Sequence, residues 1–493
     1  MSDGHSALSS RLQQLQSRFT WDLRKEDMDL ENLSTRLQDH IELQLGQPGA
    51  VARSYSFLAY VRYIQNQPQE AESLLIQSEK TTRECYGEDR EQRLIVTYGD
   101  LAWLKYHTGD YMQSQTYWQR VEDILLKYPT GSSALLHPEV YGEKAWTYLK
   151  FSRSYYPKAL EFFCKALELQ PDDCEWNAGY AIALYRTESG GSETSQQSEE
   201  SPATKQLRRA LEINPDDGVL LSMLALKLNP HQEAESLVER ALKLGSDNPH
   251  VIRYIAKYFR NKGDVERAID LLNRALKKTS QSAFIHHQLA LCYKSKKSPA
   301  NTSTNPKHWR RLCIQHLEEA VKIRPSFVLA MVDLAVLHGE EKDLDRAEKW
   351  FQQVLQMLPG SEKSICQGFH KHYADFQFYH NRNMDKAIDH YTQGLLLTPG
   401  TRNGKQCAKK LKQIAERRTL ENRNDAEAYS VLGLVAKVEG KKKEAAEFYD
   451  KALDCDGNND KYLTALCELR MELQEAAEDT SALSSFTATA QVL

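Results

Sequence analysis

Three cations, Arg253, Lys257 and Arg260, are spaced at i, i+4 and i+7 in the string RYIAKYFRNKG. In a helix this spacing places all three on one face, where like charges one turn apart repel by a few tenths of a kcal/mol. A polyanion along this face replaces the repulsion with charge-assisted hydrogen bonds, which are strong when the acceptor is phosphate. The spacing alone fits two ligands, an RNA or other phosphate ligand and an acidic peptide.

Further candidate residues lie on other segments with helical spacing. Lys150 follows Trp146 by one turn, and Trp146 is equally a candidate for a core aromatic residue between two helices. Aromatic and amide side chains beside the cations suit sugar, base or backbone contacts. The remaining candidates are Arg36 and His40 on one face, Arg186 at the end of a helix, and Tyr254, Phe284, His287 and Gln288.

A repeat of about 34 residues positions these side chains, and its spacing is typical of tetratricopeptide repeats, in which helix-turn-helix units stack into a solenoid. Small residues at positions 8, 20 and 27 let neighbouring helices approach closely. A glycine at position 15, as at Gly263 and Gly440, suits a left-handed helix cap. The clearest copies carry Ile252, Ala256, Ala268 and Ala275; Leu334, Ala335, Ala347 and Phe351; and Leu432, Gly433, Ala445 and Ala452.

We therefore expect an all-α tetratricopeptide-repeat superhelical solenoid of about ten helix-turn-helix units with a basic internal channel. In this repeat class, positions 2, 5, 9, 12 and 13 of the first helix of a unit face the concave groove. Arg253, Lys257 and Arg260 occupy positions 5, 9 and 12 of one unit, His287 is at position 5 of the next, and Lys150 is at position 13 of an earlier unit.

The composition limits the alternatives. Gly (23) and Pro (15) are scarce among 493 residues, as expected of an almost wholly helical chain. The formal net charge of −4 means that a nucleic acid has to be held by a local basic stripe. Nine cysteines without a CxxC pair predict reduced thiols. The polar start and the lack of an apolar run of about 20 residues predict a soluble cytoplasmic protein without a membrane partner.

Five segments are expected along the chain. They are an N-terminal helical segment (1–50), N-terminal repeat units (51–245) with a disordered insertion at 187–203, central units (246–398) with a polar insertion at 294–307, C-terminal helical units (399–472) that include a Lys/Arg-rich helix, and a disordered tail (473–493).

Catalytic motifs are absent from the sequence: no GxxxxGK[ST], HExxH or GxSxG string occurs. His286–His287 and His370/His372 are paired in sequence, but no Cys or acidic residue stands at metal-ligand spacing from them. We expect no enzyme activity, no metal site and no cofactor, except that a phosphate-bound Mg²⁺ stays open.

The chain also resembles a known family. The strings FTWDL (19–23), NAGYAIALYR (177–186), RYIAKYFRNKG (253–263), IHHQLALCYK (285–294) and YLTALCELR (462–470) are similar to those of the interferon-induced proteins with tetratricopeptide repeats. The similarity extends over about 10–470, and the C-terminal ending is most similar to the fifth member.

The resemblance implies a cytoplasmic antiviral protein that captures single-stranded RNA by its 5′-triphosphate and sequesters it or blocks its translation. The phosphate-pocket positions of the family correspond to Arg36, His40, Lys150 and Arg186. The RNA-backbone positions correspond to Arg253, Tyr254, Lys257, Arg260, Phe284, His287 and Gln288, and Trp146 to a cap or first-base contact.

Some residues depart from the family pattern. His40 stands where Gln is usual, and His250 where the fifth member has Tyr. Asn32 replaces an acidic residue that helps to organise a metal or water near the phosphates, and Gln44 replaces an apolar residue of the cap pocket. The second interpretation is a scaffold that binds acidic peptides or related tetratricopeptide proteins in innate immune signalling.

Overall fold

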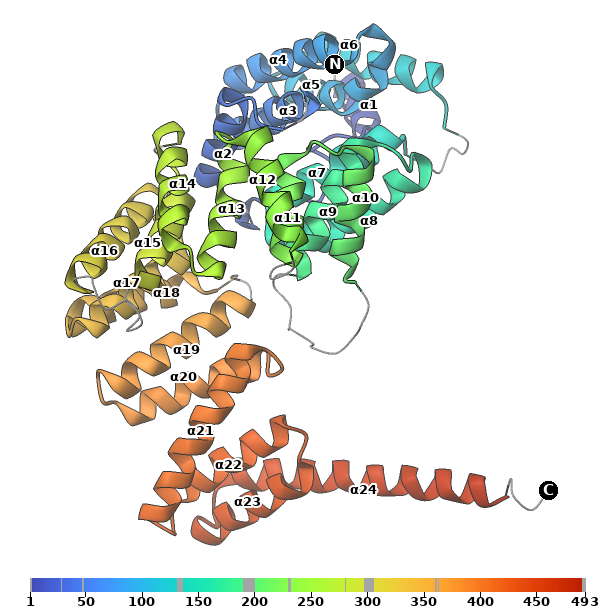
Figure 1. Ribbon diagram of the computed structural model, residues 1–493. Coiled ribbons are helices and arrows are strands. Elements are labelled where there is room, and N and C mark those ends of the chain that lie inside the picture. The colour runs from blue at the N-terminus through green and yellow to red at the C-terminus, as the bar shows by residue number, and fades with distance from the viewer. Residues whose placement is uncertain are drawn as a thin grey trace. The chain divides into compact units, whose positions relative to one another are not determined.

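The computed structural model describes residues 2–27, 29–46, 48–130, 136–188, 200–228, 232–279, 281–296, 306–359, 361 and 363–489. Within these ranges every regular element is a helix (Figure 1). The chain forms two compact units, one extending to Phe327 and the other starting at Val328.

The first unit is a stack of helical hairpins. From α3 onward each odd-numbered helix packs against the even-numbered helix that follows it, up to the pair α15 and α16. Its helices are α1 (Ser2–Leu12), α2 (Leu30–Glu42), α3 (Pro48–Ile64), α4 (Pro68–Tyr86), α5 (Ile95–His107), α6 (Tyr111–Lys127), α7 (Pro138–Phe151), α8 (Tyr156–Leu169), α9 (Cys174–Glu188), α10 (Pro202–Ile213), α11 (Gly218–Leu228), α12 (Glu233–Gly245), α13 (Pro249–Lys262), α14 (Val265–Lys278), α15 (Ala283–Lys296) and α16 (Pro306–Ile323), with short 3-10 helices at Lys25–Asp27, Glu88–Leu94 and Arg153–Tyr155.

The second unit continues this pattern with the pairs α17–α18, α19–α20 and α22–α23, and α21 packs between α20 and α22. Its helices are α17 (Val328–Glu340), α18 (Leu344–Met357), α19 (Lys363–Tyr379), α20 (Met384–Leu397), α21 (Arg402–Glu421), α22 (Ala426–Val438), α23 (Lys442–Cys455) and α24 (Asp460–Thr489).

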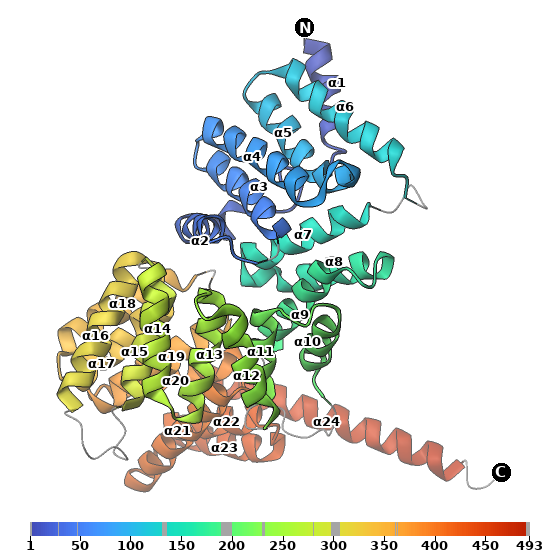
Figure 2. The same cartoon turned by 45° about the horizontal axis from the view of Figure 1, so that its top comes forward.

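The small residues predicted at the helix contacts are buried. Ala256, Ala268 and Ala275 are at most 2% exposed, so α13 lies close to α14 and to α11 and α15 on either side (Figure 2). Gly263 caps α13 with a left-handed φ of +94°, and Gly440 follows α22 with φ +79°. The repeat frame thus positions α13 as predicted.

The observed boundaries differ from the predicted segments. The compact units divide at 327/328, because α13 packs on α11 and α12 across 245/246, and α21 packs on α20 across 398/399. Helix α1 ends at Leu12 and α2 starts at Leu30, so the predicted N-terminal helical segment is helical only in part. Helix α24 runs past 472, and α9, α10, α15 and α16 extend into the ends of the two predicted insertions. The cores of those insertions, 189–199 and 297–305, and residues 490–493 lie outside the described residues.

Candidate functional site

All the predicted site residues lie on five helices of the first unit. Helix α2 carries Arg36 and His40, α7 carries Trp146 and Lys150, α9 carries Arg186, α13 carries Arg253, Tyr254, Lys257 and Arg260, and α15 carries Phe284, His287 and Gln288. Each of these helices other than α2 is the first helix of a hairpin pair, as the repeat frame predicts.

Four cations from four helices converge in this unit, and we call Arg36, Lys150, Arg186 and Arg253 the cation cluster. Burial, followed by the positive charges of Arg186 and Arg253, lowers the pKa of Arg36 to about 10. Burial, together with Arg53 and Arg36, lowers the pKa of Lys150 to about 7, although Glu143 acts in the opposite direction. The electrostatic influence of these side chains on one another shows that they share one site.

No ion pair to a carboxylate is found for any member of the cation cluster among the described residues. Carboxylates of this unit are engaged elsewhere: Glu143, which acts on Lys150, pairs with Arg18, Glu175 pairs with Arg53, and Asp29 pairs with Arg324. Unpaired cations gathered in a protein interior are costly unless an anion joins them. The cluster is therefore arranged for an anionic ligand with several charges.

The cluster is accessible to solvent. Arg36 is exposed, and Lys150, Arg186 and Arg253 keep part of their surface accessible, although protein atoms surround them closely enough for burial to be the largest influence on the pKa of Arg36, Lys150 and Arg186. Groups that line a solvent-filled interior show this combination of properties, and a ligand can reach them there.

Two tyrosines contact the cluster. Arg253 Nη2 donates a hydrogen bond to the Tyr254 hydroxyl over 3.1 Å. Burial alone would lower the pKa of Arg186, but the hydroxyls of Tyr254 and Tyr156 beside it raise the value overall. Arg253 Nε is buried and has no hydrogen-bond partner among the described residues.

Two histidines lie beside the cations. His40 and His250 pack edge to face with ring centroids 6.1 Å apart. Burial, then Lys150, Arg53 and Arg36, lowers the pKa of His40 to about 2, and burial with Arg253 and His40 holds the pKa of His250 well below its usual range. Both rings are therefore neutral in the free protein at pH 7 and can donate one hydrogen bond each.

The stripe on α13 extends from the cluster toward α15. Burial and the nearby Arg260 lower the pKa of Lys257. Arg260 Nη1 donates to Gln288 Oε1 over 2.9 Å, which fixes the guanidinium in place. Phe284 is 43% exposed and lies under the guanidinium of Arg253 at 5.6 Å, and His287 packs edge to face on Phe327. The cations and planar groups of the predicted stripe thus contact one another, with Phe284 exposed and His287 and Gln288 buried.

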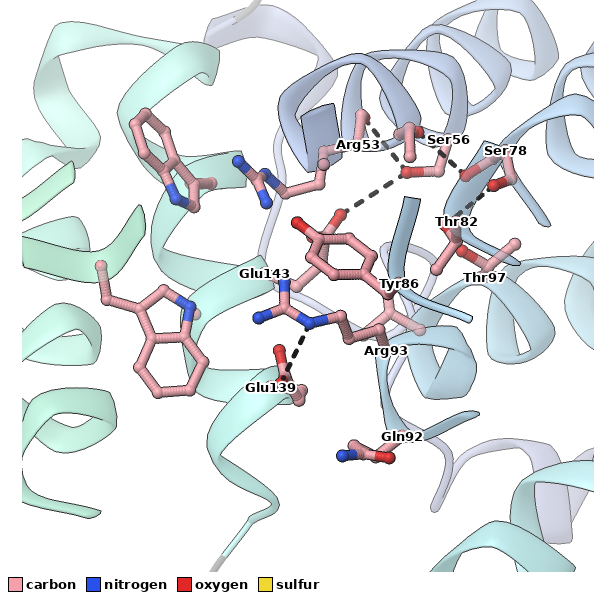
Figure 3. A pocket seen from close by; sticks show the side chains of 16 residues that line it. Arg53, Ser56, Ser78, Thr82, Tyr86, Gln92, Arg93, Thr97, Glu139 and Glu143 are labelled. Atoms are coloured by element: carbon pink, nitrogen blue, oxygen red, sulfur yellow. Dashed lines mark hydrogen bonds and ion pairs between the residues drawn. The ribbon is translucent and has the colours of Figure 1, made fainter. Parts of the chain in front are cut away.

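Trp146 lies at the edge of a small cavity of about 30 Å³ between α3, α4, α5 and α7. Figure 3 shows this cavity, with Arg53 and Arg93 close to Glu139 and Glu143. The Arg53 guanidinium lies 5.3 Å from the centre of the Trp146 ring, and Phe163 packs edge-on against the ring at 5.5 Å. Trp146 is therefore partly a packing residue, and its Nε1 is buried without a partner.

Sequence reasoning missed several residues of this site. Arg53 influences both His40 and Lys150, and the repeat frame could have found it, since Ala59 at position 8 places Arg53 at the inward position 2. Tyr156 starts α8, a second helix of its pair, and Arg324 follows α16. The rule for first helices could not have selected these two.

Comparisons with known proteins agree with this fold. Descriptions of the tetratricopeptide repeat match residues 219–283 and 426–459. The chain is 34% identical to the human "Antiviral innate immune response effector IFIT1" over 92% of this chain and 96% of that protein. It is 29% identical to human "Interferon-induced protein with tetratricopeptide repeats 2", over 91% of this chain and 96% of that protein.

Solved structures of human IFIT1 are also similar. A dimer with m7Gppp-AAAA has a TM-score of 0.82 at 33% identity, and a dimer with PPP-AAAA has a TM-score of 0.79 at 32% identity. Each comparison covers 92% of this chain and 100% of the other. The predicted class, an all-α superhelical tetratricopeptide-repeat protein, is confirmed.

The chain belongs to the family of interferon-induced proteins with tetratricopeptide repeats. The particular similarity to the fifth member stays a prediction. In the part of the chain that the structure describes, no group of three His, Cys, Asp or Glu side chains could hold a metal ion. None of the described helices combines the length and apolar character needed to cross a membrane.

Proposed function

We propose that this protein is an interferon-induced antiviral effector that captures the 5′-triphosphate end of single-stranded RNA in the cytoplasm and sequesters it or blocks its translation. The observation that carries the proposal is the cation cluster, four cations without a paired carboxylate on helices from different repeats. The similarity to a protein solved with PPP-AAAA supports this ligand class.

The cluster residues have distinct roles in this proposal. Lys150, Arg186 and Arg36 neutralise the triphosphate, and His40 donates a hydrogen bond to it. Arg253, Lys257 and Arg260 then hold the next phosphates of the backbone. Tyr254, Phe284, His287 and Gln288 contact sugars and bases, whose stacking tolerates any sequence. Binding is non-covalent, without a catalytic step.

The residues present do not favour a protein-held Mg²⁺ in the cluster. Mg²⁺ prefers carboxylate and other oxygen ligands, whereas the carboxylates of Asp29 and Glu175 are paired with arginines. Asn32 at the start of α2 carries no charge. We propose that the cations of the protein neutralise the triphosphate directly, and that affinity for triphosphate RNA is unchanged by EDTA.

Trp146 is proposed as a contact for a cap or a first base. A similar protein was solved with m7Gppp-AAAA, and a ring already flanked by a guanidinium is suited to a second planar cation or base. Trp146→Ala is expected to lower the affinity for capped RNA more than the affinity for triphosphate RNA. Equal losses for both ligands would assign the ring to packing alone.

Acidic peptides are the competing ligand class, and related tetratricopeptide proteins are competing partners. RNA is favoured because the similar structures contain RNA oligonucleotides. Purification of the protein from cells is the test: nucleic acid that is removed by nuclease should accompany the wild-type protein and not Arg186→Glu. Wild-type protein that is free of nucleic acid and binds polyglutamate as tightly as triphosphate RNA would contradict the proposal.

A further inference from the structure

Helix α21 in the second unit carries an excess of positive charge that the proposed site does not use. Seven of its twenty residues are Lys or Arg and two are Glu, in a chain whose formal net charge is −4. Helix α21 packs between α20 and α22 (Figure 1), and its buried face includes Cys407, Ala408 and Leu411. The opposite face carries the cations.

The exposed face of α21 holds a regular stripe. Arg402, Lys405 and Lys409 are exposed, and Lys412 is half-buried, with spacings of three, four and three residues that keep all four on one side of the helix. Among the described residues, none of the four forms an ion pair with a carboxylate. Glu416, one turn beyond Lys412, is also exposed without being paired to it.

The last turns of α21 itself behave differently, since Arg417 pairs with Glu421 and Arg418 with Asp425. On the following helices the lysines are mixed: Lys437 pairs with Glu468 and Lys442 with Glu472, whereas Lys443 and Lys451 form no ion pair among the described residues. The stripe on α21 is set apart by four successive cations on one side of a helix that all lack a carboxylate partner. Repulsion between like charges at i, i+4 disfavours such a stripe slightly, so an external polyanion would relieve it.

The stripe repeats the register of α13. Ile252, Ile255, Ala256 and Phe259 of α13 are buried, and Gly404, Cys407, Ala408 and Leu411 of α21 are buried at the same spacing. Relative to these buried residues, the cations of both helices occupy the same positions: Arg253, Lys257 and Arg260 on α13, and Lys405, Lys409 and Lys412 on α21. The second unit therefore presents the cation pattern that the first unit presents beside the cation cluster.

We propose that Arg402, Lys405, Lys409 and Lys412 form a second surface for the RNA backbone, which holds the strand 3′ of its captured end. This inference rests on the proposed function, because it assigns to α21 the ligand that α13 is proposed to bind. Flexible lysine side chains contact phosphates as point charges and do not read bases. The surface should therefore add affinity with RNA length and not with sequence.

The test compares a short and a long unstructured triphosphate RNA. The short probe is pppAAAA, and the long one has about 30 nucleotides, beyond the span of a single-strand site of roughly 4–16 nucleotides. The variant Lys405→Glu/Lys409→Glu/Lys412→Glu is compared with Lys441→Glu/Lys442→Glu/Lys443→Glu at the start of α23, which changes the net charge equally. Circular dichroism confirms that both variants are folded, and Lys405→Gln/Lys409→Gln/Lys412→Gln removes the charges without reversing them.

The α21 variant should bind the long RNA roughly tenfold more weakly and lower its salt slope by about 2, since each single-strand phosphate contact contributes about 0.7. It should bind pppAAAA as the wild type does, and the α23 control should bind both RNAs normally. Equal losses in the two variants, an unchanged affinity for long RNA, or competition by polyglutamate as strong as by hydroxyl-ended long RNA would overturn the inference. Failure of the wild type to distinguish triphosphate from hydroxyl ends would instead contradict the proposed function.

Discussion

Lys150 donates a hydrogen bond to Ser54 Oγ over 3.1 Å, so a half-buried ammonium is held by a neutral hydroxyl and not by a carboxylate. The same hydroxyl oxygen lies 3.1 Å from His40 Nδ1. Because no carboxylate offsets its charge, the ammonium can still form a strong charge-assisted hydrogen bond with an anionic ligand. This relationship makes Lys150 the most sensitive reporter of triphosphate binding.

Replacing Lys150 should remove the preference for a 5′-triphosphate. A hydrogen bond to a charged group contributes about 1.5–3 kcal/mol. Lys150→Gln should therefore lower the affinity for pppAAAA by roughly tenfold to a hundredfold, and Lys150→Glu should abolish the preference for a triphosphate over a hydroxyl 5′ end. Fluorescence anisotropy measures both affinities.

The matched control is Lys144→Gln on the same helix, because Lys144 lies over the ring of Phe162 at 4.7 Å and not in the cluster. An unaltered preference for triphosphate in Lys150→Glu would exclude Lys150 from the phosphate site.

Affinity for the triphosphate should fall as the pH rises above about 7. The pKa of Lys150 is lowered to about 7 in the free protein, and a bound triphosphate must raise it. Above pH 7, where Lys150 of the free protein has lost its proton, RNA binding is therefore coupled to the uptake of a proton by Lys150. Affinity is then highest below the free pKa and falls by up to tenfold per pH unit above it. Isothermal titration calorimetry in buffers of different ionisation enthalpy measures the proton uptake directly.

Lys150→Arg provides the comparison, since a guanidinium stays charged throughout this range. The variant should bind triphosphate RNA with little dependence on pH between about 7 and 9, where the triphosphate is fully ionised. A wild-type profile as flat as that of Lys150→Arg would show that Lys150 is already fully protonated.

The α13 stripe should determine the salt dependence of RNA binding. Each phosphate contact that is lost lowers the slope of log K against log salt by about 0.7 for a single strand. Lys257→Gln and Arg260→Gln should each lower it by this amount, and Arg267→Gln on α14, whose guanidinium lies over Phe259, should not. Identical slopes in all three variants would place the RNA elsewhere.

Gly179 should be irreplaceable for packing reasons. A Cβ at this position would lie 2.3 Å from Phe163 Cζ and 2.9 Å from Trp146 Cζ2. Gly179→Ala should therefore lower the free energy of unfolding by about 1–3 kcal/mol, measured by urea denaturation.

Gly368→Ala is the opposite case, because the nearest atom, Asn403 Nδ2, is 3.8 Å from the added Cβ. It should stabilise the protein by about 0.4–1 kcal/mol through the lower entropy of the unfolded chain. Stabilisation of both variants would mean that the contact of Gly179 with Phe163 relaxes freely.

Much of the fold could be predicted from the spacing of small residues, because Ala256, Ala268 and Gly263 meet steric requirements that recur in several units. The α13 stripe could be predicted in the same way, since its residues are neighbours on one helix. The convergence of Arg36, Lys150, Arg186 and Arg253 could not be predicted from spacing, because these residues are far apart in sequence and only the stacking of the helices brings them together. The resemblance to a family supplied that grouping.

The unit boundaries and the role of Arg53 were harder to predict from the sequence. A solenoid has no single core, so its sequence carries no marked change at 327/328, where the compact units divide. Arg53 is held by the carboxylate of Glu175, 122 residues away, and only the folded chain shows that this pairing leaves Lys150 and His40 beside the guanidinium.

The central claim is that the unpaired cations Arg36, Lys150 and Arg186 select a 5′-triphosphate. The most direct measurement compares the binding of AAAA with a triphosphate 5′ end and with a hydroxyl 5′ end to the purified wild-type protein at one salt concentration. We predict at least about a hundredfold preference for the triphosphate, because two or more charge-assisted contacts of about 1.5–3 kcal/mol each are lost with the hydroxyl end. Equal affinities for the two RNAs would contradict the account.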